Sequence, residues 1–121
     1  MAKRDVLRDG EILCEVERAF RRRGWGRGRN GALILTDLRL VFISTTVMFR
    51  RSRVELWELP EIENVEVFDS KIRPDDGAIR VVFGAAEPRR EPVDFENIDG
   101  GTERATELAV WIERQARLLA T

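Results

Sequence analysis

A single twelve-residue run, GALILTDLRLVF at residues 31–42, constrains the fold of this chain more than any other segment. Leu33 and Leu35 occupy alternate positions before a polar pair, Thr36 and Asp37. After that pair, apolar residues recur at every second position: Leu38, Leu40 and Phe42. Alternating runs on both sides of a short polar turn predict a β-hairpin with one buried face.

The same alternation predicts further short strands before and after the hairpin. A first strand ends near residue 20 and places four residues on one face: Ile12, Cys14, Val16 and Phe20. The segment that follows this strand, residues 21–31, is rich in Arg and Gly and is expected to be a loop. After the hairpin, Val54 and Leu56 open a fourth strand, and the alternation slips at Trp57, which indicates a bulge or the end of the strand.

Three later strands and one helix complete the pattern. The strands are expected around Val65 and Val67, then Ile79, Val81 and Phe83, then Val93 and Phe95, so that seven strands span about residues 11–97. A helix over about residues 102–120 is predicted by apolar residues at helical spacing: Ala105, Leu108, Ala109, Ile112, Ala116 and Leu119. Its polar face carries charges of both signs, so we expect it to pack on its own sheet rather than on a membrane.

Composition limits the chemistry that the chain can perform. The 121 residues are 43% hydrophobic and 36% charged, as expected for one domain, residues 1–121, with one core. Cys14 is the sole cysteine and histidine is absent, so the chain forms no internal disulfide, no Cys/His zinc site and no Cys-His or Ser-His nucleophile. We expect a buried Cys14, no enzyme activity, and no metal or cofactor.

The N-terminal residues show no secretory signal, and no apolar run approaches the roughly 20 residues of a membrane span. A cytoplasmic protein, free or peripheral to a membrane, is therefore expected. Two acidic clusters, Asp75-Asp76 and Asp94 with Glu96, are explained by a turn and by the solvent face of a strand.

Three segments resemble the GRAM and bacterial pleckstrin-homology-like (PH-like) domains. The turn DGE at residues 9–11 looks like the entry to their first strand. The hairpin is similar to their pattern G-x-L-x-L-T-x-x-R-L-x-F, with Thr36 and Arg39 at the expected places. The segment LPEIENV at residues 59–65 resembles their turn into the fifth strand.

This resemblance implies a seven-stranded barrel of two roughly orthogonal antiparallel sheets, capped by the C-terminal helix. Domains with this fold bind lipids, peptides and other proteins, so the fold alone does not choose the ligand. The resemblance further implies that three connections open at one end of the barrel: those between strands one and two, three and four, and six and seven.

Those three connections are rich in arginine, and guanidinium groups bind phosphate and carboxylate in a bidentate manner. The resemblance also implies a phosphoinositide signature like that of PH domains. Its basic positions would be held by Arg23, Arg27 and Arg29. The candidate anion- and lipid-binding residues are Arg21, Arg22, Arg23, Trp25, Arg27, Arg29, Arg50, Arg51, Arg53, Arg89 and Arg90. The expected partner is an anionic membrane surface or an acidic protein.

Other interpretations of the same residues stay open. The arginines could be solvated surface only. The fold also has exposed sheet edges that accept strands, so a module for protein binding or self-assembly into homo-oligomers is an alternative, with Trp57 as an exposed anchor or as a core residue. Nucleic-acid binding through residues 21–29 is a third reading, and an isoelectric point near 5.6 argues against it.

Overall fold

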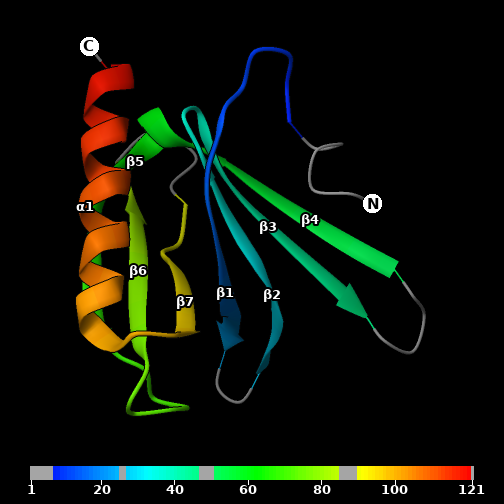
Figure 1. Cartoon of the computed structure of the whole chain (residues 1–121), viewed down its shortest axis with the longest axis vertical. Coiled ribbons are helices and arrows are strands. Elements are labelled where there is room, and N and C mark those ends of the chain that lie inside the picture. The colour runs from blue at the N-terminus through cyan, green and yellow to red at the C-terminus, as the bar shows by residue number, and fades with distance from the viewer. Residues whose placement is uncertain (1–6, 25–26, 47–50, 85–89, 121) are drawn as a thin grey trace.

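The computed structural model describes residues 7–24, 27–46, 51–84 and 90–120. Seven strands and a C-terminal helix make up the fold (Figure 1). Their bounds are β1 (Leu13–Gly24), β2 (Arg27–Thr36), β3 (Arg39–Thr46), β4 (Arg51–Glu58), β5 (Ile62–Asp69), β6 (Gly77–Phe83), β7 (Val93–Ile98) and α1 (Gly101–Ala120). A short 3₁₀ helix, η2 (Leu59–Glu61), joins β4 to β5. The predicted seven strands and closing helix are confirmed.

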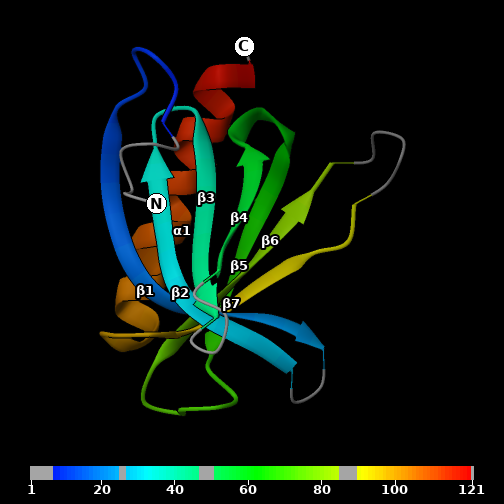
Figure 2. The ribbon, with the colours of Figure 1, turned by 90° about the vertical axis from the view of Figure 1, so that its right-hand side faces the viewer.

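All seven strands belong to one antiparallel sheet, in the order β4-β3-β2-β1-β7-β6-β5. β1 joins its two halves, because it pairs with β2 along its length and with β7 only at Phe20, Arg21 and Arg22. The two antiparallel sheets that were expected are continuous, because they share this strand. The sheet does not close, since β4 and β5 form its two ends, and α1 packs across β5 and β6 (Figures 1 and 2).

The hairpin predicted at residues 31–42 joins β2 to β3. Leu35 pairs with Leu40 and Leu33 pairs with Phe42, and all four side chains are buried. The turn is formed by Asp37 and Leu38, so Leu38 lies in the turn rather than in the strand. The hairpin and its buried face are confirmed.

The core lies between the concave face of the sheet and α1. Phe95 of β7 is at its centre, with its ring centroid 5.5 Å from that of Phe42 and 5.6 Å from that of Trp57. From the helix come the buried residues Ala105, Leu108, Ala109, Ile112 and Ala116. Trp111 and Leu119 pack against the edge of this core, so the apolar stripe predicted for the helix is confirmed.

The prediction for β4 had its two faces exchanged. Trp57 is buried and pairs with Leu40, whereas Leu56 is 49% exposed on the other face. The pairing of β3 with β4 runs without a shift from Arg39 to Thr46, so the strand has no bulge. Trp57 and the buried Leu59 are two residues apart and point to the same side of the chain. Burial of this pair removes more apolar surface from water than burial of Val54 and Leu56 would, so Trp57 faces the core. Trp57 is a core residue and not an exposed anchor.

The prediction for the first strand was also wrong about its faces. Ile12 is 62% exposed and Cys14 is exposed, and the register of β1 on β2 shifts between Leu13 and Glu15. The core-facing positions of β1 instead carry Glu15, Glu17 and Ala19, as their partners in β2 show. The two glutamates are held by Arg104 of α1, whose guanidinium lies 2.8 Å from Glu15 and 3.0 Å from Glu17.

The strand expected around Val65 and Val67 is confirmed as β5, and one expectation is corrected in β7. Val67 pairs with the buried Ile79, as Val65 pairs with the buried Val81, and Val67 is 36% exposed on that same face. Glu96, expected on the solvent face of a strand, is fully buried.

A buried polar cluster fixes the hairpin turn to the segment before β1. The Arg39 guanidinium donates to both carboxylate oxygens of Glu11, at 2.9 Å from Nε and 2.5 Å from Nη2. The Thr36 hydroxyl donates to Glu11 at 2.6 Å and accepts from the Arg39 backbone N–H at 2.9 Å. The hydrogen bond from Arg39, more than any other contact, lowers the pKa of Glu11 from 4.5 to about 2.

Candidate functional site

Charged residues occupy core-facing positions of the sheet near the end where β1 stops and β2 starts. Figure 1 shows these two strand ends side by side. Arg21 of β1 lies directly opposite Arg29 of β2, so both side chains are on the same face. On β4, Arg53 and Glu55 stand four and two residues before the inward-facing Trp57. Their side chains therefore lie on the same face of the sheet as Trp57. We call Arg21, Arg23, Arg29, Arg53 and Glu55 the arginine face.

Arg21 spans this face from β1 to β4. Its guanidinium carbon lies 5.9 Å from the centroid of the Trp57 ring, and its Nη2 lies 3.4 Å from Glu55. Its Nη1 donates to the backbone carbonyl of Arg22 at 2.6 Å. Burial lowers the pKa of Arg21, with Glu55 acting in the opposite direction. Among the described residues, the buried Nε of Arg21 has no hydrogen-bond partner, so one donor of this group is unused.

Glu55 is the central counter-ion of the arginine face. Its Oε2 faces Arg21, and its Oε1 accepts from Arg23 at 2.7 Å. Its side chain is 18% exposed and that of Arg23 is 30% exposed, so the cluster lies at the surface without being fully solvated. As defined, the arginine face holds four guanidinium groups and the carboxylate of Glu55, and the carboxylate of Asp94 also acts electrostatically on Arg21.

These arginines lie in strands and not in a loop. β1 continues to Gly24 and β2 begins at Arg27, which corrects the expected loop over residues 21–31. Strand pairing assigns each side chain to a fixed face, so the segment does not present its arginines together. Arg27 is exposed at the first position of β2.

Arg22 lies on the opposite face from Arg21 and has a structural contact. Its Nη1 donates to Glu96 Oε2 at 3.1 Å. The other oxygen of Glu96 accepts from the backbone N–H of Lys71 at 2.7 Å and faces the Ser70 hydroxyl at 3.4 Å. Glu96 thereby fixes the β5–β6 connection to β7 and β1, and Arg22 is the counter-ion of a buried carboxylate.

Arg90 lies elsewhere in the fold. Its Nη1 is 2.8 Å from Glu61 of η2, and its guanidinium carbon lies 5.6 Å from the centroid of Phe83 at the end of β6. Figure 2 shows the end of β6 in the upper half of the view and the adjoining ends of β1 and β2 in the lower half. The structure therefore does not bring Arg90 to the arginine face.

The remaining candidates are only partly described. Trp25, Arg50 and Arg89 lie outside the described residues. The backbone of Arg51 pairs with Thr46 at the start of β4, beside Arg53. Among the residues that the structure describes, it thus brings together Arg21, Arg23, Arg29 and Arg53, and separates Arg22 and Arg90 from them.

Sequence reasoning missed Glu55 and Glu96, the two acids that decide where the arginines lie. Glu55 could have been found from strand parity, since it stands two residues before Trp57. Glu96 stands one residue after the buried Phe95, a position that normally faces solvent, and no local signal shows its burial.

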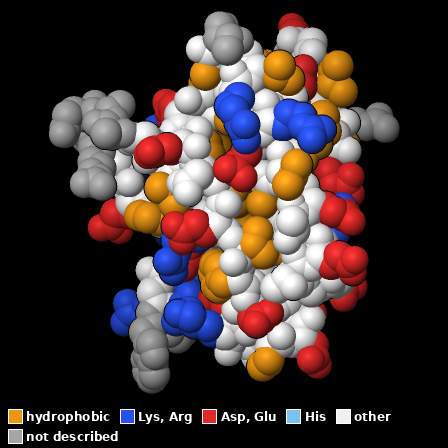
Figure 3. Space-filling view, turned by 90° about the vertical axis from the view of Figure 1, so that its left-hand side faces the viewer, with side chains coloured by type: hydrophobic (Ala, Val, Ile, Leu, Met, Phe, Trp, Pro, Cys, Tyr) orange, Lys and Arg blue, Asp and Glu red, His pale blue; other side chains and the backbone are white. Residues whose placement is uncertain are grey.

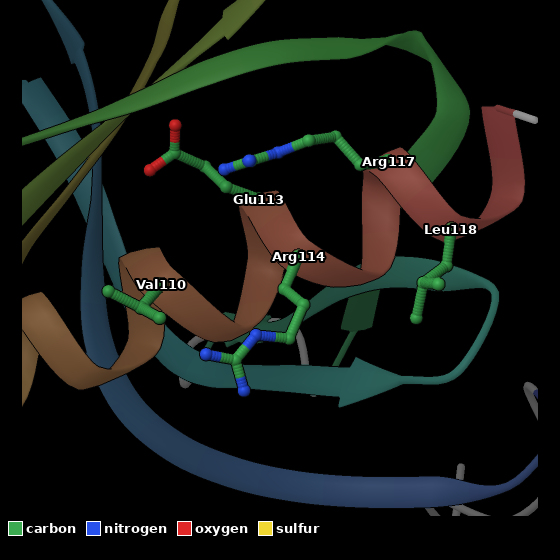
Figure 4. A pocket seen from close by; sticks show the side chains of 5 residues that line it. All are labelled: Val110, Glu113, Arg114, Arg117 and Leu118. Carbon is green, nitrogen blue, oxygen red and sulfur yellow. The ribbon is translucent and has the colours of Figure 1, made fainter.

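Two hollows lie away from the arginine face. A groove of about 900 Å³ on the outer side of β1–β3 is lined by charges of both signs, including Arg18, Arg73, Asp76 and Asp99. A hollow of about 420 Å³ lies on the outer surface of α1, where Val110, Arg114 and Leu118 project to one side and Glu113 and Arg117 to the other (Figure 4). On the molecular face shown in Figure 3, acidic and basic side chains are interspersed.

The described residues hold no group of three or more acidic or cysteine side chains placed to bind a metal ion. Within the same ranges, no helix is long and apolar enough to cross a membrane.

Several solved structures have a similar fold. The hSac2 domain from human phosphoinositide phosphatase Sac2 superposes with a TM-score of 0.74 at 11% identity, covering 96% of this chain and 76% of that one. The Vps36 N-terminal PH domain gives 0.68 at 15% identity, covering 94% and 85%. A DUF1696 family protein with a pleckstrin-homology domain, from Shewanella loihica, gives 0.60 at 15% identity, covering 93% and 85%.

At these identities the similarity shows the fold alone, and that fold is PH-like. The PH-like part of the sequence prediction is confirmed, and its GRAM part stays a prediction. Searches against protein-family models and curated proteins found no match.

Proposed function

We propose that this chain is a non-enzymatic binding module of PH-like fold, and that its arginine face binds the phosphate groups of anionic lipid headgroups. The observation that carries the proposal is the arrangement around Glu55. Arg21 and Arg23 converge on one carboxylate, and this internal oxyanion between two guanidinium groups supports a site for an anionic ligand. Arg29 and Arg53 add positive charge on the same face, which favours a ligand with more negative charge than Glu55 supplies.

A lipid surface suits this site because the arginines lie on rigid strands at one end of the sheet. Long arginine side chains reach an anionic surface while their stems stay on the protein. With this function the protein would work in the cytoplasm, at the surface of a membrane that contains acidic lipids. The structural similarity to the Vps36 PH domain and to a domain of a phosphoinositide phosphatase is consistent with this proposal.

Vesicle sedimentation tests the proposal. The wild-type protein is expected to sediment with phosphatidylcholine vesicles that contain phosphatidylserine or a phosphoinositide, and not with phosphatidylcholine alone. Binding should fall between about 0.1 M and about 1 M salt, as the screening length shortens from about 10 Å to about 3 Å. The double variant Arg23→Glu/Arg29→Glu should lose sedimentation.

A matched control separates the site from overall charge. The double variant Arg114→Glu/Arg117→Glu changes the net charge equally, on exposed residues of α1. It should sediment as the wild type does. If both variants lose vesicle binding equally, the binding depends on overall charge alone, and the proposed site is contradicted. If the wild type fails to sediment at low salt, the lipid ligand is refuted, and an NMR titration with an acidic peptide then tests the acidic-protein alternative.

A further inference from the structure

The outer edge of β4 is one of the two edges of the sheet. β4 stands at one end of the strand order, and within the described ranges it is paired with β3 alone. Figure 1 shows β4 on the side of the molecule opposite α1. Its outward-facing Leu56 is 49% exposed, and Val54 is half-buried. An edge strand with apolar side chains presents backbone hydrogen-bonding groups to another strand.

Strand geometry restricts how two copies of β4 can pair. In a regular antiparallel ladder, residues directly opposite one another have side chains on the same face and backbone groups in matching directions. Both properties alternate along a strand with a period of two. A two-fold symmetric pair is therefore centred on a residue opposite its own copy, and registers centred between residues are excluded.

Charge selects one of these registers. When Val54 is the central residue, Arg53 lies opposite the partner's Glu55, and Glu55 lies opposite the partner's Arg53. Centring on Arg53 or on Glu55 sets two like charges against each other. Centring on Leu56 sets Val54 against the partner's Glu58 and forms no pair of opposite charges.

The outer face of the sheet supports the same register. Ala32, Ile43 and Val54 lie side by side across β2, β3 and β4, because Ala32 pairs with Ile43 and Ile43 pairs with Val54. With Val54 opposite its copy, this apolar row runs on without interruption into the partner. A hydrophobic contact thus coincides with the two ion pairs.

We propose that the chain forms a homodimer in which the β4 strands of two copies pair antiparallel, centred on Val54. The two sheets join into one, and both arginine faces lie on the same side of it. The partner's Arg53 is placed opposite Glu55 and brings a further cation to a carboxylate that already binds Arg21 and Arg23. This proposal does not depend on the proposed ligand.

Disulfide trapping tests the register directly. Residues opposite each other in an antiparallel pair have Cα atoms about 4.5–5.5 Å apart, inside the range for a disulfide. In a Cys14→Ser background, Val54→Cys should form a covalent dimer under mild oxidation, seen on a non-reducing gel. Ser52→Cys is the matched control, because its own copy lies four residues away, about 13 Å. Ser52 is the more exposed of the two residues, so random collision would favour the control.

Analytical ultracentrifugation provides the second measurement. The wild type should show a concentration-dependent dimer, and Arg53→Glu should weaken it about tenfold or more, because Glu then faces the partner's Glu55. A mixture of Arg53→Glu with Glu55→Arg, each confirmed as folded by circular dichroism, should form heterodimers through two restored pairs. A monomeric wild type at millimolar concentration, equal cross-linking of both cysteine variants, or folded variants that fail to combine would overturn the proposal.

Discussion

Replacement of Glu11 by Gln should destabilise the protein strongly at neutral pH and much less in acid. The Glu11 side chain is fully buried, and its carboxylate accepts from the Arg39 guanidinium and the Thr36 hydroxyl. Its pKa is lowered from 4.5 to about 2, so the folded state prefers the ionised form. A group with a lowered pKa contributes stability that is complete above its unfolded value and is lost as the pH falls through the folded value.

The size of the effect follows from that shift. A change from 4.5 to about 2 corresponds to about 3.4 kcal/mol of folding free energy at pH 7, since one pKa unit is worth 1.36 kcal/mol. At pH 3, where the unfolded carboxyl is already protonated, the same linkage leaves about 1.4 kcal/mol. Glu11→Gln also leaves the charge of Arg39 buried, and breaking such a pair costs about 3–5 kcal/mol.

Urea unfolding at pH 7 and at pH 3, followed by tryptophan fluorescence, measures both quantities. The free-energy difference between the wild type and Glu11→Gln should shrink by about 2 kcal/mol between the two pH values. Glu58→Gln is the control, because its partner Arg8 and Glu58 itself are both exposed, and such pairs contribute under about 1 kcal/mol. A pH-independent difference, or equal losses in the two variants, would refute the proposed role of the cluster.

Two further predictions concern Glu96 and Cys14. Glu96→Gln should lower the free energy of unfolding by about 2 kcal/mol, because it weakens the charged hydrogen bonds to Arg22 and to the Lys71 backbone. Glu66→Gln, on an exposed residue, should change this free energy by under about 0.5 kcal/mol. Equal melting temperatures for the two variants would contradict the role given to Glu96. Cys14, being exposed, should react with iodoacetamide in the folded protein, with a rate that still rises above pH 9, because partial burial and then the carboxylates of Asp37 and Glu15 raise the pKa of its thiol from 9.0. Reaction only in urea would show that the thiol is protected.

Local periodicity predicted which elements form, because alternation and helical spacing depend on residues close in the chain. The hairpin and α1 were predicted in this way, down to the buried Leu33, Leu35 and Ile112. The faces of β1 could not be predicted from the same signal. Glu17 occupies a core-facing position only because Arg104, 87 residues away, pairs with it there.

The candidate site shows the same limit. Arginine-rich segments indicated where positive charge concentrates, and Arg21 and Arg23 do lie on one face. Which arginines stay together is decided by acids on other elements of the fold. Glu96 of β7 holds Arg22, and Glu61 of η2 holds Arg90, through contacts that no short sequence window contains.

If the arginine face binds an anion as proposed, the carboxylate of Glu55 competes with that ligand from within the protein. It is attached to β4 beside Arg21 and Arg23, so a free anion must displace a group whose effective concentration is far above that of a solute. A singly charged ion such as chloride or acetate gains too little from the exchange. A phosphate with two charges, or several phosphates held on one surface, gains contacts with Arg29 and Arg53 as well. With the proposed function, Glu55 would therefore exclude anions of low charge density from the arginine face.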